Sequence, residues 1–281
     1  MATSFSSALG VDNKAFKSVG ILDAIIGVDT RLFLDPFLLK RTQIPEFKQS
    51  RQKIAKYYQD IITLLVASRT RGDKAWQEAL RRLTFKELHG VSIGYGVHTG
   101  NGSAIGHELA GRLINTAREI LDMGIKDPDI FELIGLFEDD FGADRLSDMT
   151  IVVIYQDLLR FTQRISAELG IKSLVDVLSG GETFRLPRNP SGRGFLILLP
   201  ESLLSPLPVA LGWDGIEQVV AHNQQLRQRL NQLIGASWKN KITKRQLRGV
   251  IFSNPENIGV LLAAYKNSTP PPLRFCCRSR E

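Results

Sequence analysis

Residues 46–69 have the sequence EFKQSRQKIAKYYQDIITLLVASR, which contains the longest helical pattern in the chain. Apolar side chains recur along it at helical spacing, at Phe47, Ile54, Tyr58, Ile61, Ile62 and Leu65. That spacing places them on one face of an α-helix. Pro45 stands at the entrance, where proline is tolerated. The stretch therefore predicts a long amphipathic helix with one buried face.

Capping residues and glycines mark further helices. The ranges expected to be helical are 73–83, 103–123, 129–137, 148–169, 214–235, a short stretch after Thr243, and 255–265. Ser103 and Ser147 are expected to cap two of them, because a serine hydroxyl can accept a hydrogen bond from a first-turn amide. Gly124 is expected to adopt the left-handed conformation that ends a helix. Asn254-Pro255 is expected to open the last helix.

Strands are expected to be few and short. Leu32-Phe33-Leu34 is an apolar triplet followed by the turn-forming pair Asp35-Pro36, which predicts a core strand and a turn. Residues 85–97 are expected to form a strand pair or a strand and a loop, and residues 195–199 a short buried strand. About eight helices against three to five strands predict an α+β fold in which helices dominate.

The domain organisation is predicted from a change in composition. Glycine, proline and arginine concentrate in residues 179–194, which are expected to form a hinge. On that division, residues 1–178 are a helix-rich N-terminal subdomain and residues 195–267 a smaller subdomain of a strand and helices. Residues 268–281 are expected to be a disordered tail. With 281 residues, 43% of them hydrophobic, the chain can bury a substantial core.

The composition also argues against several classes of protein. The N-terminus has no basic start, and no apolar stretch approaches the roughly 20 residues of a membrane span. A cytoplasmic location without membrane contact is therefore expected. Cys276 and Cys277 are adjacent and have no His or Cys partners at metal-site spacing. They predict neither a disulfide framework nor a zinc site.

Positive charge is concentrated in one segment, residues 218–255, which contains no Asp or Glu. Its basic residues are Arg227, Arg229, Lys239, Lys241, Lys244, Arg245 and Arg248. A concentrated basic face favours phosphate-bearing partners, so these residues are the candidate contacts to DNA or RNA. The alternative is an ordinary solvated helix surface.

A group of acidic residues follows the apolar stretch 130–137. Glu138, Asp144 and Asp148 are the candidate ligands of Mg²⁺. Asp144 and Asp148 are four positions apart and would share one face of a helix, and carboxylates so placed can hold a divalent cation. They would form the catalytic centre of a metal-dependent phosphohydrolase; no other cofactor is expected. The structural alternative is that Asp148 lies in the first turn of a helix, where the helix dipole favours negative charge.

Six glycines lie between residues 90 and 106 and lead into an expected helix. The candidate phosphate loop consists of Gly100, Gly102, Ser103 and Gly106. Glycine lets backbone amides approach a phosphate, and a helix N-terminus adds partial positive charge. The spacing matches neither a Walker loop nor a dinucleotide fingerprint. The alternative is a plain glycine-rich connection.

Three phrases carry a resemblance to a known family. They are DTRLFLDP at residues 29–36, GADRLSDM at residues 142–149, and Leu198-Leu199-Pro200 continuing to Leu207-Pro208. Over most of residues 10–266 the chain resembles an uncharacterised family of bacterial proteins. The resemblance implies an N-terminal module that is followed, in full-length members, by a separate domain similar to PD-(D/E)XK nucleases. At the strand candidates around Glu87, Glu182 and Glu201, no acid-x-lysine triplet completes the site of such a nuclease.

The sequence LRFCCRS at residues 273–279 is unusual, because two adjacent exposed thiols invite oxidation. With suitable codons, a shifted reading frame would give Tyr-Asp-Phe-Ala-Val-Asp, which contains the phrase that the resemblance places before the nuclease-like domain. We therefore expect a frameshifted tail, with the nuclease-like part lost or encoded separately.

These observations predict a non-catalytic recognition or regulatory module of a nuclease-associated bacterial system, such as genome defence. Its partners would be DNA or RNA and a separately encoded nuclease-like domain. The competing predictions are the metal-dependent phosphohydrolase and a protein-interaction scaffold, which would expose a large apolar patch.

Overall fold

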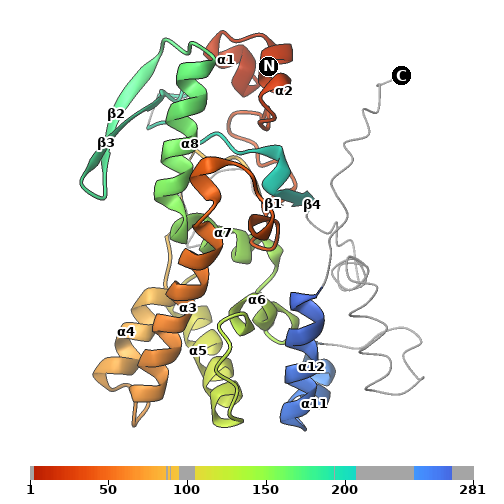
Figure 1. The fold of residues 1–281 in the computed structure, drawn as a ribbon. Coiled ribbons are helices and arrows are strands. Elements are labelled where there is room, and N and C mark those ends of the chain that lie inside the picture. The colour runs from red at the N-terminus through yellow and green to blue at the C-terminus, as the bar shows by residue number, and fades with distance from the viewer. Residues whose placement is uncertain are drawn as a thin grey trace.

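The computed structural model describes residues 3–86, 88, 90–94, 105–192, 194–206 and 244–267 (Figure 1). Its α-helices are α1 (Phe5–Leu9), α2 (Asn13–Ser18), α3 (Ser50–Ala67), α4 (Lys74–Leu83), α5 (His107–Asp122), α6 (Ile130–Leu133), α7 (Ala143–Val153), α8 (Tyr155–Glu168), α11 (Lys244–Ile251) and α12 (Pro255–Lys266). The 3₁₀ helices are η1 (Leu38–Lys40), η2 (Pro45–Phe47), η3 (Ile134–Leu136) and η4 (Glu201–Leu203). The strands are β1 (Leu32–Leu34), β2 (Leu174–Ser179), β3 (Glu182–Pro187) and β4 (Leu204–Pro206). The helix-dominated α+β class is confirmed.

Helix α3 packs against α4, α5 and α7 (Figure 1). Its buried apolar residues are Ile54, Tyr58, Ile61, Ile62 and Leu65, as the sequence predicted. The α-helix begins at Ser50 because residues 45–47 form the 3₁₀ helix η2 instead. Phe47 in η2 is fully buried, and its ring lies 5.4 Å from the ring of Phe161 in α8. Every helix within the described ranges is too short or too polar to span a bilayer.

Helix α7 corrects the prediction that Ser147 is a helix cap. The helix already begins at Ala143, so Ser147 lies inside it. Its Oγ accepts a hydrogen bond of 2.9 Å from the backbone N–H of Leu34, and thereby joins α7 to β1. A buried amide needs such a partner. The prediction of one continuous helix over 148–169 was also wrong, because α7 ends before Ile154 and α8 follows. Gly170, after α8, has a positive φ of 63°.

Other helix ends show which local signals are reliable. Gly124 has the positive φ expected after α5, and Asn254 Oδ1 accepts a 3.0 Å hydrogen bond from the N–H of Glu256 at the start of α12. Helix α5 begins at His107, and the expected cap Ser103 lies outside the described residues. The helix expected over 129–137 is shorter, since α6 gives way to η3 where Gly135 lowers helical propensity.

The sheet of β1 and β4 joins distant parts of the chain. Leu34 pairs with Leu204 in antiparallel register and is fully buried, so the predicted core strand is confirmed. The turn after it is also confirmed, because Asp35 Oδ1 accepts a 2.9 Å hydrogen bond from the N–H of Phe37. Residues 196–199 are buried, but the predicted strand over 195–199 is not formed. Their backbone bonds go to separate segments, for instance Leu198 N to Thr162 Oγ1 at 3.0 Å.

Strands β2 and β3 form an antiparallel hairpin beside α8 (Figure 1). The turn consists of Gly180 and Gly181, both with positive φ, as a tight two-residue hairpin turn requires. Hydrogen bonds tie the hairpin to α8, among them Gln156 Nε2 to Ser179 Oγ at 2.7 Å. The segment 179–194, predicted as a hinge, thus begins inside this hairpin. The division into two subdomains stays a prediction.

Candidate functional site

Five acidic residues of the helical body contact the C-terminal helices α11 and α12. They come from α5, α6 and the segments next to α6, and we call them the acidic patch: Glu119, Asp127, Asp129, Glu132 and Glu138. Each one faces a basic or phenolic group of α11 or α12. The contacts form two clusters, one at α11 and one at the end of α12.

The first cluster centres on Arg248 of α11. Its guanidinium donates hydrogen bonds to Glu119 at 2.6 Å, to Thr116 Oγ1 at 2.8 Å and to the buried carboxylate of Glu138. Thr116 in turn donates to Glu138. Bonds between charged partners are roughly twice as strong as neutral ones. Arg248 also lies over the ring of Phe252, 5.0 Å from its centre.

Lys244 holds the first turn of α11. Its Nζ donates to the backbone oxygens of Glu138 at 2.7 Å and of Phe141 at 3.0 Å. Burial lowers the pKa of Lys244, while the nearby carboxylates of Asp139 and Asp140 act in the opposite direction. Lys244 therefore stabilises the turn at residues 138–141 instead of pointing into solvent.

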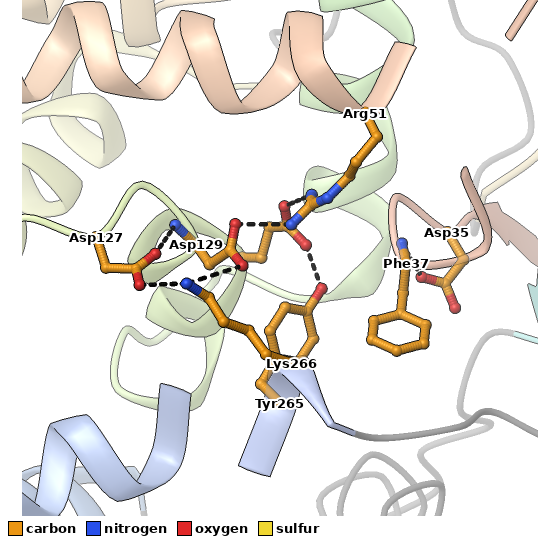
Figure 2. A network of polar contacts seen from close by, with 8 residues as sticks. Asp35, Phe37, Arg51, Asp127, Asp129, Tyr265 and Lys266 are labelled. Atoms are coloured by element: carbon orange, nitrogen blue, oxygen red, sulfur yellow. Dashed lines mark hydrogen bonds and ion pairs between the residues drawn. The ribbon is translucent and has the colours of Figure 1, made fainter. Parts of the chain in front are cut away.

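The second cluster surrounds Arg51 of α3 (Figure 2). Its guanidinium donates to Asp129 at 2.6 Å and to Glu132, and the hydroxyl of Tyr265 donates to the same Glu132 carboxylate. The side chain of Glu132 is 1% exposed, so this carboxylate depends on these partners. Lys266 adds an ion pair to Asp127 and a longer one of 3.9 Å to Asp129.

The electrostatics of the second cluster follow from its burial. Burial raises the pKa of Glu132, and the positive charge of Arg51 only partly offsets that effect. For Arg51, burial alone would lower the pKa, but the carboxylates of Glu132 and Asp129 outweigh it and raise the value. Burial, followed by the charge of Glu132, also raises the pKa of Tyr265 well above its usual value. The cluster thus links α3, α6 and α12 through buried polar contacts.

Lys40 lies at the edge of this second cluster. Its Nζ is 4.2 Å from the ring centre of Phe37 and 5.0 Å from that of Tyr265, and the two rings meet edge to face at 5.4 Å. Burial lowers the pKa of Lys40, and the charge of Arg51 adds to this effect. Cation–π contact with the two rings therefore helps to hold α12 against η1.

The structure does not gather the three predicted metal ligands. Glu138 is turned toward Arg248, Asp144 lies in the first turn of α7, and Asp148 lines a hollow with Lys86 and the apolar residues Leu88, Val91, Ile93, Ile151 and Val152. Across the part of the chain that the structure describes, no three His, Cys, Asp or Glu side chains are grouped so that they could hold a metal ion.

The predicted phosphate loop falls mostly on undescribed residues. Gly100, Gly102 and Ser103 lie outside the described ranges, whereas Gly106 is the N-cap residue of α5. Val91 and Ile93, which line the hollow at Asp148, belong to the glycine-rich stretch that leads to this loop, at least seven positions before Gly100.

The predicted nucleic-acid contacts are divided by the structure. Arg227, Arg229, Lys239 and Lys241 lie outside the described residues. On α11, Arg245 is exposed, whereas Lys244 and Arg248 face the helical body together with the buried residues Leu247 and Ile251. The sequence had placed all three basic residues of α11 in one group, because charge counting does not show which way a side chain points.

The cluster around Arg51 was missed by sequence reasoning. One signal was present, since Glu132 stands inside the apolar run 130–137. A carboxylate in such a run must find a cation or protonate when the run is buried. The identity of its partner, Arg51, is not visible in the sequence, because the two residues are 81 positions apart.

Comparison with known families finds a match over most of the chain. Residues 10–211 match the model of a family described as "Domain of unknown function (DUF8370)". The chain belongs to this family. The acidic patch lies inside the DUF8370 region, whereas α11 and α12 come after it. No curated protein and no solved structure matches the chain.

Proposed function

We propose that this DUF8370 member is a recognition or regulatory module that binds DNA or RNA through a basic surface on and before α11. We also propose that it works with a separately encoded nuclease-like domain in a bacterial system such as genome defence. The observation that supports nucleic-acid binding best is the orientation of α11. The helix is anchored through one face, and Arg245 on its other face is exposed.

The charge around α11 supports the same proposal. The four basic residues at 227–241 precede the helix without any intervening Asp or Glu. Together with Arg245 they bring five positive charges to this part of the sequence. Phosphate contacts of this kind supply affinity without base specificity, so the surface fits the nucleic-acid backbone.

The test is a titration of a fluorescent 20-base-pair DNA and of a single-stranded RNA with the full chain, followed by anisotropy at several salt concentrations. The triple variant Lys239→Ala, Lys241→Ala, Arg245→Ala should weaken binding and reduce the salt dependence by about 0.9 per lost contact to duplex DNA. The matched control is Arg69→Ala, Arg71→Ala, Lys74→Ala, which removes the same charge from exposed positions around the start of α4. Equal losses in both variants, or no binding by the wild type, would refute the proposal in this form.

A second candidate function is the metal-dependent phosphohydrolase, which the hollow at Asp148 favours. One carboxylate and one ammonium group, Asp148 and Lys86, line it among apolar side chains. Such a pair can hold a cation and a phosphate when further ligands converge on it. Release of phosphate from nucleoside triphosphates in the presence of Mg²⁺, lost in Asp148→Asn and retained in Asp122→Asn on α5, would support it. Retained activity in Asp148→Asn would remove it.

A protein-interaction scaffold is the third candidate. Leu178 is 76% exposed on the β2–β3 hairpin, and Val66, Val28 and Ile25 are also exposed. Single exposed apolar side chains are common, so only a shared patch would favour this function. Reduced self-association or partner binding in Leu178→Ser would support it.

A further inference from the structure

The basic residues of α11 have two different environments. Arg245 is exposed, whereas Lys244 and Arg248 are held by the helical body. Arg248 donates to two carboxylates and a hydroxyl, which are anionic and polar acceptors comparable to those of a phosphate group. The carboxylates of Glu119 and Glu138 therefore occupy the guanidinium donors that a nucleic-acid backbone would use.

We propose that the acidic patch sequesters α11: Glu119 and Glu138 hold Arg248, together with its neighbour Lys244, away from phosphate until a polyanion displaces them. This inference rests on the proposed nucleic-acid binding and adds its regulation. In the docked state Arg245 is the exposed basic side chain of α11. In the released state Lys244 and Arg248 join it.

Helix α12 has contacts to the helical body that do not involve α11. Helix α12 has its own anchors in the second cluster, through Tyr265 and Lys266, and it buries Ile258, Leu261 and Leu262. The outer half of the α11 cluster is open to solvent, since the side chains of Glu119 and Arg248 are 45% and 27% exposed. An ion pair in that position is accessible to salt and to a competing anion.

The test combines two measurements on the full chain. Hydrogen–deuterium exchange of residues 244–251 reports whether α11 is docked, and anisotropy with the 20-base-pair DNA reports affinity. The variants are Glu119→Gln and the double variant Glu119→Gln, Glu138→Gln. Glu108→Gln is the matched control for Glu119→Gln, because Glu108 is an exposed residue of the same helix and both changes remove one negative charge. Glu119→Lys, at an exposed position, replaces the double variant if loss of the buried Glu138 carboxylate prevents folding.

We expect faster exchange of α11 in both patch variants than in the control. Glu119→Gln should bind DNA about threefold more tightly than Glu108→Gln, as expected when a partly exposed ion pair no longer competes. Release of two further cations in the double variant should steepen the log–log salt dependence by about 2. DNA added to the wild type should also speed exchange of α11.

The outcomes separate this inference from the proposed function. If the wild type does not bind DNA but the double variant does, constitutive binding is refuted and sequestration is supported. Faster exchange of α11 with no gain in affinity over Glu108→Gln overturns sequestration, even where the wild type binds DNA. Slower exchange of α11 when DNA is added to the wild type would also overturn it.

Discussion

The second cluster, around Arg51, gives the sharpest prediction about stability. Arg51→Met removes the only guanidinium that Asp129 and Glu132 share among the described ion pairs. The side chains of Arg51, Asp129 and Glu132 are 14%, 9% and 1% exposed, so the remaining carboxylates stay away from water. Breaking a buried ion pair by removing one partner costs about 3–5 kcal/mol, because a buried charge is left uncompensated.

The predicted loss of about 3–5 kcal/mol should lower the thermal midpoint by roughly 10 °C for a chain of this size. The assay is urea and thermal unfolding of the full chain, followed by circular dichroism. The control is Arg81→Met, because Arg81 pairs with Glu78 on the exposed surface of α4, with side-chain exposures of 73% and 34%. Such a pair contributes about 0–1 kcal/mol.

The comparison of the two variants can refute the reasoning. If the free energies of unfolding of Arg51→Met and Arg81→Met differ by less than about 1 kcal/mol, burial does not strengthen this ion pair. The double variant Arg51→Met, Glu132→Gln offers a second check. Its loss in free energy of unfolding should be smaller than the sum of the losses in the two single variants, because the second change removes the uncompensated carboxylate.

Three further predictions concern single groups. The pKa of Glu132 is raised above its usual value of 4.5, so its contribution to stability is complete below pH 4.5 and is lost as the pH rises through the folded-state pKa. The urea midpoint of the wild type should therefore fall over that pH range relative to the midpoint of Glu132→Gln, and parallel pH profiles of the two proteins would contradict this. Ser147→Ala should lower the free energy of unfolding by about 1–3 kcal/mol, since the buried N–H of Leu34 loses its acceptor, and a change below about 0.5 kcal/mol would disprove that role. Asn254→Ala should cost about 1 kcal/mol through loss of the α12 cap, and exchange in the first turn of α12 should rise, whereas unchanged exchange there would count against the cap.

Local signals in the sequence were sufficient for individual elements. The apolar spacing of residues 46–69 predicted the buried face of α3, and Asn254-Pro255 predicted the start of α12. These features depend on neighbouring residues and on the 3.6-residue helical period, so a single sequence contains them. Ser147 shows the limit of local reasoning, because its hydroxyl had a distant amide as an alternative partner.

The site required the tertiary structure. From the sequence, Glu138 and Arg248 were candidates for two different functions, a metal centre and a nucleic-acid surface, yet they lie in one ion pair across 110 positions. Sequence determined the charge of each residue, the buried face of α3 and the DUF8370 family region. Only the packing of α11 and α12 against α5 and α6 decided which charges neutralise each other, because periodicity indicates that a helix has a buried face but not which helix covers it.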